Sequence, residues 1–154
     1  MRALWISAGI LVIVLVVIQF FQSPKNISHG SDGNDMLEVI SSLTPQQKDM
    51  IRNSCYDCHS NHTVYPWYGH IAPVSWMLSS HIREGKEHLN LSEWASLSDR
   101  KRISALQEMG EVVAKGQMPL KGYARLHKKA RLTADQKDQL LTWMDTETKR
   151  LMGE

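Results

Sequence analysis

The sequence predicts an all-α protein in which an N-terminal transmembrane helix precedes a small helical domain. Residues 3–21 form an uncharged apolar run, and apolar side chains in the rest of the chain recur at helical spacing. No segment alternates apolar and polar residues as a strand would. The 154 residues, of which 42% are hydrophobic and 22% charged, suffice for one domain and an appendage. We therefore divide the chain into an anchor (residues 1–21), a linker (22–34) and a domain (35–154).

The apolar run is long enough to cross a bilayer. Its only polar residues are Ser7 and Gln19, and at ~1.5 Å per residue a helix over residues 3–21 reaches about 28 Å, close to the hydrocarbon thickness. Bulky residues follow it where a signal peptidase needs small ones. We therefore expect an uncleaved, single-pass signal anchor. Arg2 before it and Lys25 after it give a weak charge bias toward a cytoplasmic N-terminus.

The segment that follows the anchor has the composition of a linker. Residues 22–34 are rich in Gly, Ser, Pro and Asn and lack apolar periodicity, which predicts a flexible chain. A chain of this length has a root-mean-square reach of roughly 20 Å. It would keep the domain close to the membrane.

Two helices are expected in the first half of the domain. The first begins at Pro45 and runs into the cysteine motif described below, because Thr44 suits the N-cap and Gln47 completes a capping box. The second spans residues 73–88. The apolar face of this second helix comprises Val74, Met77, Leu78, His81 and Ile82.

Two more helices are expected at residues 98–114 and 134–150, the latter capped by Thr133. Long loops are expected at residues 60–72 and 115–132. The inward-facing residues of these helices are Ile103, Leu106, Met109 and Val113 in the first and Leu140, Trp143 and Met144 in the second.

Both cysteines of the chain lie in the stretch NSCYDCHSNH, residues 53–62. On a helical turn Cys55, Cys58 and His59 stand at positions i, i+3 and i+4, so their side chains project from the same side. This arrangement suits a covalent haem, since two thiols can add to the two vinyl groups of the porphyrin while the adjacent imidazole ligates the iron. The motif therefore predicts one haem c, with His59 as the proximal ligand.

Other chemistries fit the motif less well. A zinc site would need Cys55, Cys58, His62 and a fourth ligand such as His70, a spacing that matches no usual zinc finger and leaves His59 unused. A thioredoxin-like redox pair would follow a strand in a βαβ unit, and no such unit is predicted. A chance match also stays open, but it would have to place both cysteines of the chain in the motif.

The sixth iron ligand has two candidates. Met118 lies in the stretch KGQMPL, where Gly116 and Pro119 favour an irregular loop that lets the thioether point inward. The alternative is His81, which lies on the apolar face of its helix. Each also has a purely structural interpretation, since methionine commonly fills core gaps and a lone histidine on such a face is commonly a core residue. We prefer Met118.

Two stretches of the sequence resemble the membrane-anchored haem-binding domain family of bacterial c-type cytochromes. They are SCYDCHSNHTVYPWYGHIAPVSWMLSSHIREGKEHLNLSEW and GQMPLKGYARLHKKARLTADQKDQLLTW, and the resemblance covers roughly residues 35–150. It implies a cytochrome c-like helical haem domain on the periplasmic or extracytoplasmic side of a bacterial inner membrane. It also implies that the c-type cytochrome maturation machinery attaches the haem.

A basic block follows the proposed sixth ligand. No acidic residue lies between Met118 and Asp135. Such a run is usually a solvated surface, but near a haem edge it would speed the encounter with an acidic redox partner. Anionic lipid headgroups are a competing target. The basic residues of the block are Lys121, Arg125, Lys128, Lys129 and Arg131.

The sequence thus favours a membrane-tethered monohaem cytochrome that passes single electrons between redox partners. We expect no enzymatic activity, because no Ser-His-Asp set, paired-carboxylate pocket or phosphate loop is evident. A net charge of +2 gives no argument for nucleic-acid binding. The alternative functions are a haem-based sensor or small-ligand-binding module with a displaceable or vacant sixth ligand, and a zinc-bound interaction domain.

Overall fold

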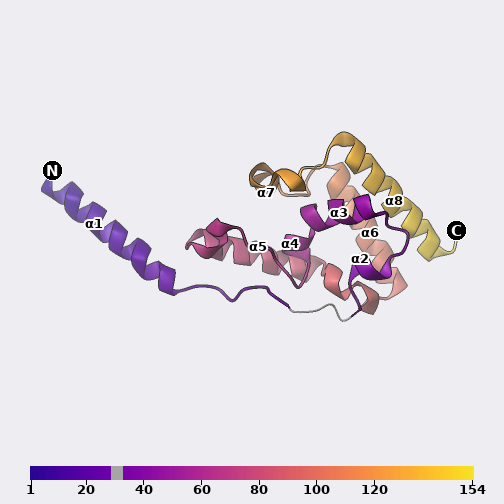
Figure 1. Ribbon diagram of the computed structural model, residues 1–154, viewed down its shortest axis with the longest axis horizontal. Helices are drawn as coiled ribbons and strands as arrows, with labels where there is room; N and C mark the ends of the chain where they lie inside the picture. The colour runs from indigo at the N-terminus through magenta and orange to yellow at the C-terminus, as the bar shows by residue number, and fades with distance from the viewer. Residues whose placement is uncertain (29–32) are drawn as a thin grey trace.

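The computed structural model describes residues 1–28 and 33–154, and Figure 1 shows an isolated N-terminal helix joined to a helical domain. The chain is 71% helical, and the described residues form no β-strand beyond an isolated bridge between Ile27 and His62. The predicted all-α class is confirmed.

The N-terminal helix α1, Arg2–Val17, continues as a short 3-10 turn, Ile18–Phe20. Together these 19 residues have a mean hydropathy of 2.6, and none of them is buried against the rest of the chain. By length and composition the helix could cross a membrane. Because it is apolar and yet has no buried residue, it is not a core helix of the domain.

The first helix of the domain proper, α2, spans Met36–Val39 and is capped by the Asp35 side chain. Helix α3, Pro45–Ser54, begins with the predicted capping box, in which Thr44 and Gln47 bond each other's backbone N–H groups. The remaining elements are α4 (Tyr56–His59), a 3-10 turn (Trp67–His70), α5 (Val74–His88), a 3-10 segment (Leu91–Ser96), α6 (Asp99–Ala114), α7 (Lys121–Leu126), a 3-10 turn (Lys128–Ala130) and α8 (Ala134–Met152).

The four predicted domain helices are thus present as α3, α5, α6 and α8. The two predicted loops are less irregular than expected, because each contains short helical segments, namely Trp67–His70 in the first and both Lys121–Leu126 and Lys128–Ala130 in the second. These segments are held by contacts with distant parts of the chain, described below, rather than by helical periodicity.

The apolar core lies where α6 packs along α8 and where α2, α3 and the Leu91–Ser96 segment cover that pair. The inward-facing residues predicted for α8 are all buried, as are those of α6 except the half-buried Ile103. The fully buried large apolar residues of the core are Met36, Ile51, Leu91, Leu106 and Leu140.

The predicted apolar face of α5 is only partly correct. Ile82 is buried and Leu78 is half-buried, but Val74, Met77 and His81 are exposed. The buried side of α5 lies toward Ser75 and Ile82 instead. Apolar spacing predicted the helix correctly, but the direction in which it packs depends on its neighbours.

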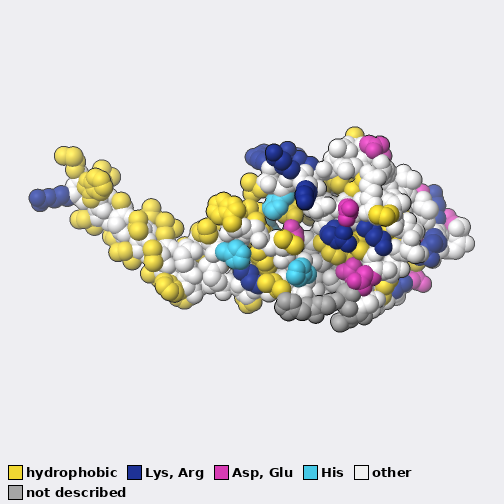
Figure 2. Space-filling model, in the orientation of Figure 1, with side chains coloured by type: hydrophobic (Ala, Val, Ile, Leu, Met, Phe, Trp, Pro, Cys, Tyr) yellow, Lys and Arg dark blue, Asp and Glu magenta, His cyan; other side chains and the backbone are white. Residues whose placement is uncertain are grey.

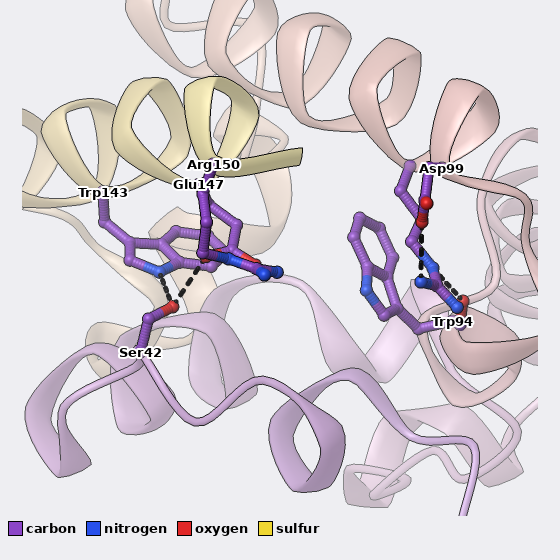
Figure 3. A network of polar contacts seen from close by, with 7 residues as sticks. Ser42, Trp94, Asp99, Trp143, Glu147 and Arg150 are labelled. Atoms are coloured by element: carbon purple, nitrogen blue, oxygen red, sulfur yellow. Dashed lines mark hydrogen bonds and ion pairs between the residues drawn. The ribbon is translucent and has the colours of Figure 1, made fainter. Parts of the chain in front are cut away.

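A polar network fastens α8 to the turn before α3 (Figure 3). The Ser42 hydroxyl donates to the Glu147 carboxylate over 2.9 Å and accepts from the Trp143 indole over 3.2 Å. Arg150 donates two hydrogen bonds to the same carboxylate, and this lowers the pKa of Glu147 despite its burial. A buried carboxylate paired in this way is stabilising only while its partners remain in place.

The predicted linker also differs from the structure. Asn26 bonds to the Ser60 carbonyl over 2.8 Å and to the Thr63 hydroxyl over 2.9 Å, and the Ser28 N–H donates to the Asn61 carbonyl over 2.9 Å. This part of the linker is packed on the domain rather than free, because the loop after the cysteine motif offers it polar partners. Residues 29–32 of the linker lie outside the described residues.

Candidate haem site

The cysteine motif lies where α3 gives way to α4. The Cys55 N–H donates to the Ile51 carbonyl, and the His59 N–H donates to the Cys55 carbonyl, both over 2.9 Å. The backbone therefore makes one further helical turn through the motif, as its spacing requires. Cys55, Cys58 and His59 are each half-buried, and both thiols are free.

Burial keeps both thiols protonated at neutral pH. It is the main factor that raises the pKa of Cys55, and together with the Asp57 and Cys55 charges it raises the pKa of Cys58 to about 11. Redox-active cysteines instead have a lowered pKa, because the thiolate is the reacting form. The thiols thus lack the activation expected of a thioredoxin-like pair.

The zinc alternative lacks a ligand set among the described residues, where no group of three or more His, Cys, Asp or Glu side chains could hold a metal ion. His62 is exposed, and its Nδ1 bonds to the Ser28 carbonyl over 3.2 Å. His70 is also exposed and packs against the Tyr65 ring. The two histidines that a zinc site would need are therefore engaged elsewhere.

His59 is held as a neutral imidazole. Its Nδ1 lies 3.0 Å from the Leu89 carbonyl oxygen, and since a carbonyl only accepts, Nδ1 carries the proton and Nε2 keeps the lone pair. Burial lowers the pKa of His59, although the Leu89 and Gly85 carbonyls partly offset this. A second hydrogen bond that fixes tautomer and ring orientation is typical of metal-ligating histidines.

Helix α5 approaches the motif through a glycine. A Cβ atom at Gly85 would lie 2.7 Å from the Cys58 carbonyl oxygen and 3.3 Å from the Cys58 Cβ. The first distance is too short for a Cβ atom, so only glycine fits at this position without a shift of the backbone. Glycine inside a helix costs roughly 1 kcal/mol relative to alanine, and here it allows the backbone of α5 to contact α4. The sequence carried one signal of this contact, a glycine inside an otherwise regular helix.

The two residues between the cysteines fasten the motif to distant segments. The Tyr56 hydroxyl donates to the Asp35 carboxylate over 2.7 Å, which ties the motif to the cap of α2. The Asp57 carboxylate accepts from the Tyr123 hydroxyl over 2.6 Å, which ties it to α7. Burial and the Asp57 carboxylate raise the pKa of Tyr123. These roles were not predicted from the sequence, because neither pair has a local signature.

The aromatic contacts of α7 extend this connection. The Tyr123 ring stacks on the His127 ring with a centroid separation of 4.2 Å. His127 Nε2 in turn lies 2.6 Å from the Tyr68 hydroxyl. The segment that follows Met118 is therefore joined both to the motif and to the loop after it.

The two candidate sixth ligands occupy different positions. Met118 is half-buried between α6 and α7, in a turn where Gly116 has a φ of +64° and the Met118 N–H donates to the Val112 carbonyl over 3.1 Å. The irregular loop predicted there is confirmed. His81 is exposed on α5, one turn before Gly85 and thus on the side of α5 that meets Cys58. Ligation by either side chain stays a prediction.

The basic block is exposed beside the motif. All five of its residues are exposed, and Figure 2 shows a cluster of Lys and Arg side chains at the position of α7 in Figure 1. Lys128 and Lys129 line a cavity of about 860 Å³ together with Tyr56 and Asp57 of the motif. Arg131 donates to the last carbonyls of α7, so its guanidinium also has a structural role.

Apolar side chains are exposed on α5 and after Met118. Val74 and Met77 are exposed on the same side of α5 as His81. Leu120, which is 39% exposed, follows Met118. Two protonated thiols, a neutral imidazole and these apolar side chains form a donor set and surroundings that fit a haem.

Comparison with known proteins supports this assignment. The family model of the haem-binding domain matches residues 13–146, which run from within α1 to within α8 and include the whole cysteine motif. Neither a curated protein nor a solved structure gave a significant match. Because the family model covers most of the chain, this protein belongs to the haem-binding domain family.

Proposed function

We propose that the protein is a membrane-tethered c-type cytochrome that carries one covalent haem and passes single electrons between redox partners. The observation that carries this proposal is the helical turn on which Cys55, Cys58 and His59 stand together, with the imidazole held neutral by the Leu89 carbonyl. Both thiols are free to add to the vinyl groups during maturation. The bound haem supplies a one-electron couple at its iron.

The residues around the motif hold the site in place. The Leu89 carbonyl fixes the plane of the His59 ring and increases the basicity of Nε2. Met118 is the proposed second iron ligand, and its neutral thioether would favour the reduced iron. The Tyr123–Asp57 hydrogen bond fastens the segment after Met118 to the motif. In this proposal the chain orients and encloses a redox centre and needs no catalytic side chain.

The basic block is the proposed docking surface for an acidic redox partner. Its exposure beside the motif supports this role, because a positive surface near the redox centre speeds encounter without requiring high affinity. The apolar helix α1 supports single-pass anchoring in a bacterial inner membrane. The haem domain would then lie on the periplasmic side.

Production with a c-type cytochrome maturation system tests the proposal. We expect a pyridine haemochrome spectrum typical of two thioether bonds, and pigment that stays with the protein after acid denaturation and solvent extraction. The double variant Cys55→Ser, Cys58→Ser should lose the pigment under the same conditions. Pigment that the solvent removes from the unsubstituted protein would contradict covalent attachment.

The sixth ligand separates a carrier from a sensor. Met118→Ala should abolish the weak far-red band of methionine-ligated ferric haem, whereas the matched variant His81→Ala should retain it. If the unsubstituted protein lacks this band and its reduced form binds carbon monoxide, the electron-carrier function is wrong and the haem-based sensor is favoured.

A further inference from the structure

The junction between α1 and the domain is fixed by hydrogen bonds. The Gln19 side chain accepts from the Ala72 N–H over 2.9 Å and donates to the Ala72 carbonyl over 3.1 Å. The Trp76 indole N–H donates to the Phe21 carbonyl. Lys25 donates to the Gly69 carbonyl, and its ammonium lies 4.3 Å from the centroid of the Tyr65 ring. The start of α5 and the loop before it are therefore held beside the end of the apolar helix.

These bonds fix the depth of the loop relative to the bilayer. If α1 and its 3-10 extension span the hydrocarbon, Phe20 and Phe21 lie at the membrane boundary. Ala72 and Trp76 bond to Gln19 and Phe21, so they lie at the same boundary. Figure 1 likewise shows the start of α5 as the part of the domain nearest to the end of α1.

The side chains at this depth are apolar and aromatic. Trp67 is 76% exposed, Ile71 is 45% exposed and Trp76 is 37% exposed. Figure 2 shows hydrophobic side chains where the apolar helix meets the domain. Residues 60–82 contain no Asp, Glu, Lys or Arg, although 22% of the chain is charged. Such a segment can enter the interface without the cost of desolvating a charge.

This surface is separate from the haem site. On α5, Trp76 points away from the side that carries Val74, Met77 and His81. It lies two, one and five positions from them, and at about 100° per residue none of these spacings brings two side chains to one face. Trp76 is turned toward the end of α1, to which it is bonded. Trp76 is therefore not among the side chains assigned to the haem site.

We infer that residues 66–76 rest in the lipid headgroup region, with Trp67, Ile71 and Trp76 inserted at the interface. Tryptophan favours this region because its ring is apolar and its N–H is polar. The domain then stands on the bilayer at a fixed height, rather than swinging on a free linker. The inference rests on the proposed anchoring by α1.

Site-directed spin labelling of the full-length holoprotein tests the inference. Both native cysteines would be blocked by the haem, so a single new cysteine takes the label. Trp67→Cys reports on the proposed contact, and Arg100→Cys, at an exposed position on α6, is the matched control. In phosphatidylcholine nanodiscs that hold one copy each, we expect several-fold lower collision with a water-soluble nickel complex at position 67 than at position 100.

A third label distinguishes failure of the contact from failure of the anchor. Ile10→Cys lies in the middle of α1 and should be accessible to oxygen but not to nickel. If position 10 is in the hydrocarbon while position 67 is as accessible to nickel as position 100, the interface contact is overturned and the anchor stands. If position 10 is exposed to water, the proposed anchor itself fails.

A charged substitution shows which surface contacts the lipid. Ile71→Glu should return the label at position 67 to water, whereas Leu126→Glu, on exposed α7 and 68% exposed itself, should not. If the label at position 67 stays as protected from nickel in the Ile71→Glu variant as without it, the inference is overturned. Shielding that arises only in nanodiscs with two copies would also overturn it, in favour of a contact between copies.

Discussion

The two halves of the domain are held together in different ways. The half built from α2, α3, α6 and α8 has a continuous apolar core, with residues such as Ile51, Leu106 and Leu140 fully buried. The half around the motif, made of α4, α5 and α7, is joined by individual hydrogen bonds and by one glycine contact. Its apolar side chains Val74 and Met77 are exposed.

The difference shows where a haem would contribute to stability. An apolar core stabilises a fold through area removed from water, and it tolerates the loss of one contact. A hydrogen bond contributes roughly 1 kcal/mol net. A half held mainly by such bonds therefore has a small free energy of unfolding. A flat apolar cofactor bound there would provide the buried area that the motif half lacks.

Loss of the haem should therefore separate the two halves. In the Cys55→Ser, Cys58→Ser variant we expect amide hydrogen exchange to become fast in α4, α5 and α7 while α6 and α8 remain protected, because only the latter share the apolar core. Mass spectrometry of peptides from both halves measures this. Uniform protection and one cooperative melting transition would show that the motif half folds without the cofactor.

The glycine contact should be the most sensitive point within the holoprotein. Gly85→Ala places a methyl group against the Cys58 carbonyl oxygen, and such overpacking costs about 1–3 kcal/mol. Gly110→Ala is the matched control, since its Cβ would meet Leu141 and Met144 at ordinary distances of 3.8 and 3.9 Å. It should be neutral or gain up to about 1 kcal/mol from helix propensity. Urea unfolding measures the change in the free energy of unfolding for both variants. Equal changes would show that the contact at Gly85 is no tighter than that at Gly110.

The bond between α7 and the motif should have an intermediate effect. Tyr123→Phe removes a hydrogen bond to the Asp57 carboxylate, and bonds to charged groups contribute about 1.5–3 kcal/mol. Tyr68→Phe removes the bond to His127 and should cost less, about 0.5–1.5 kcal/mol. We also expect Tyr123→Phe to weaken the far-red methionine band. A band and a stability that match those of Tyr68→Phe would mean that α7 does not position Met118.

The acid sensitivity of the core half should be the smallest effect. Arg150 lowers the pKa of the buried Glu147, so this carboxylate stabilises the fold above the ordinary pKa of glutamate, about 4.3, and loses that contribution as the pH falls toward its lowered value. Glu147→Gln should lower the free energy of unfolding by about 1 kcal/mol at neutral pH. It should also reduce the dependence of stability on pH in the acid range. Thermal melts between neutral pH and pH 3 measure it.

Glu111 provides the control for that measurement. Lys115 also lowers the pKa of Glu111, but the pair is exposed and water screens it. Glu111→Gln should therefore leave the pH dependence of the melting temperature unchanged. If both variants reduced the pH dependence of the melting temperature equally, the burial of Glu147 would be unimportant for its effect.

Local features of the fold were predicted well from the sequence. The capping boxes at Thr44 and Thr133 and the helices that follow them are present. The helical turn of the cysteine motif is also as predicted. Two predictions were wrong: Met77 faces outward rather than into the core, and Asn26 of the predicted linker is bonded to the domain rather than free. Both errors concern what a segment packs against.

The sequence by itself determined the apolar N-terminal helix, the domain helices and the spacing of Cys55 and Cys58, because each depends on residues close together in the chain. Only the tertiary structure decided that Gly85 meets Cys58 and that Tyr123 bonds to Asp57. These partners are far apart in the chain, and no local periodicity links them. Their contacts depend on how α5 and α7 meet α4, and this arrangement is set by tertiary contacts rather than by helix propensity.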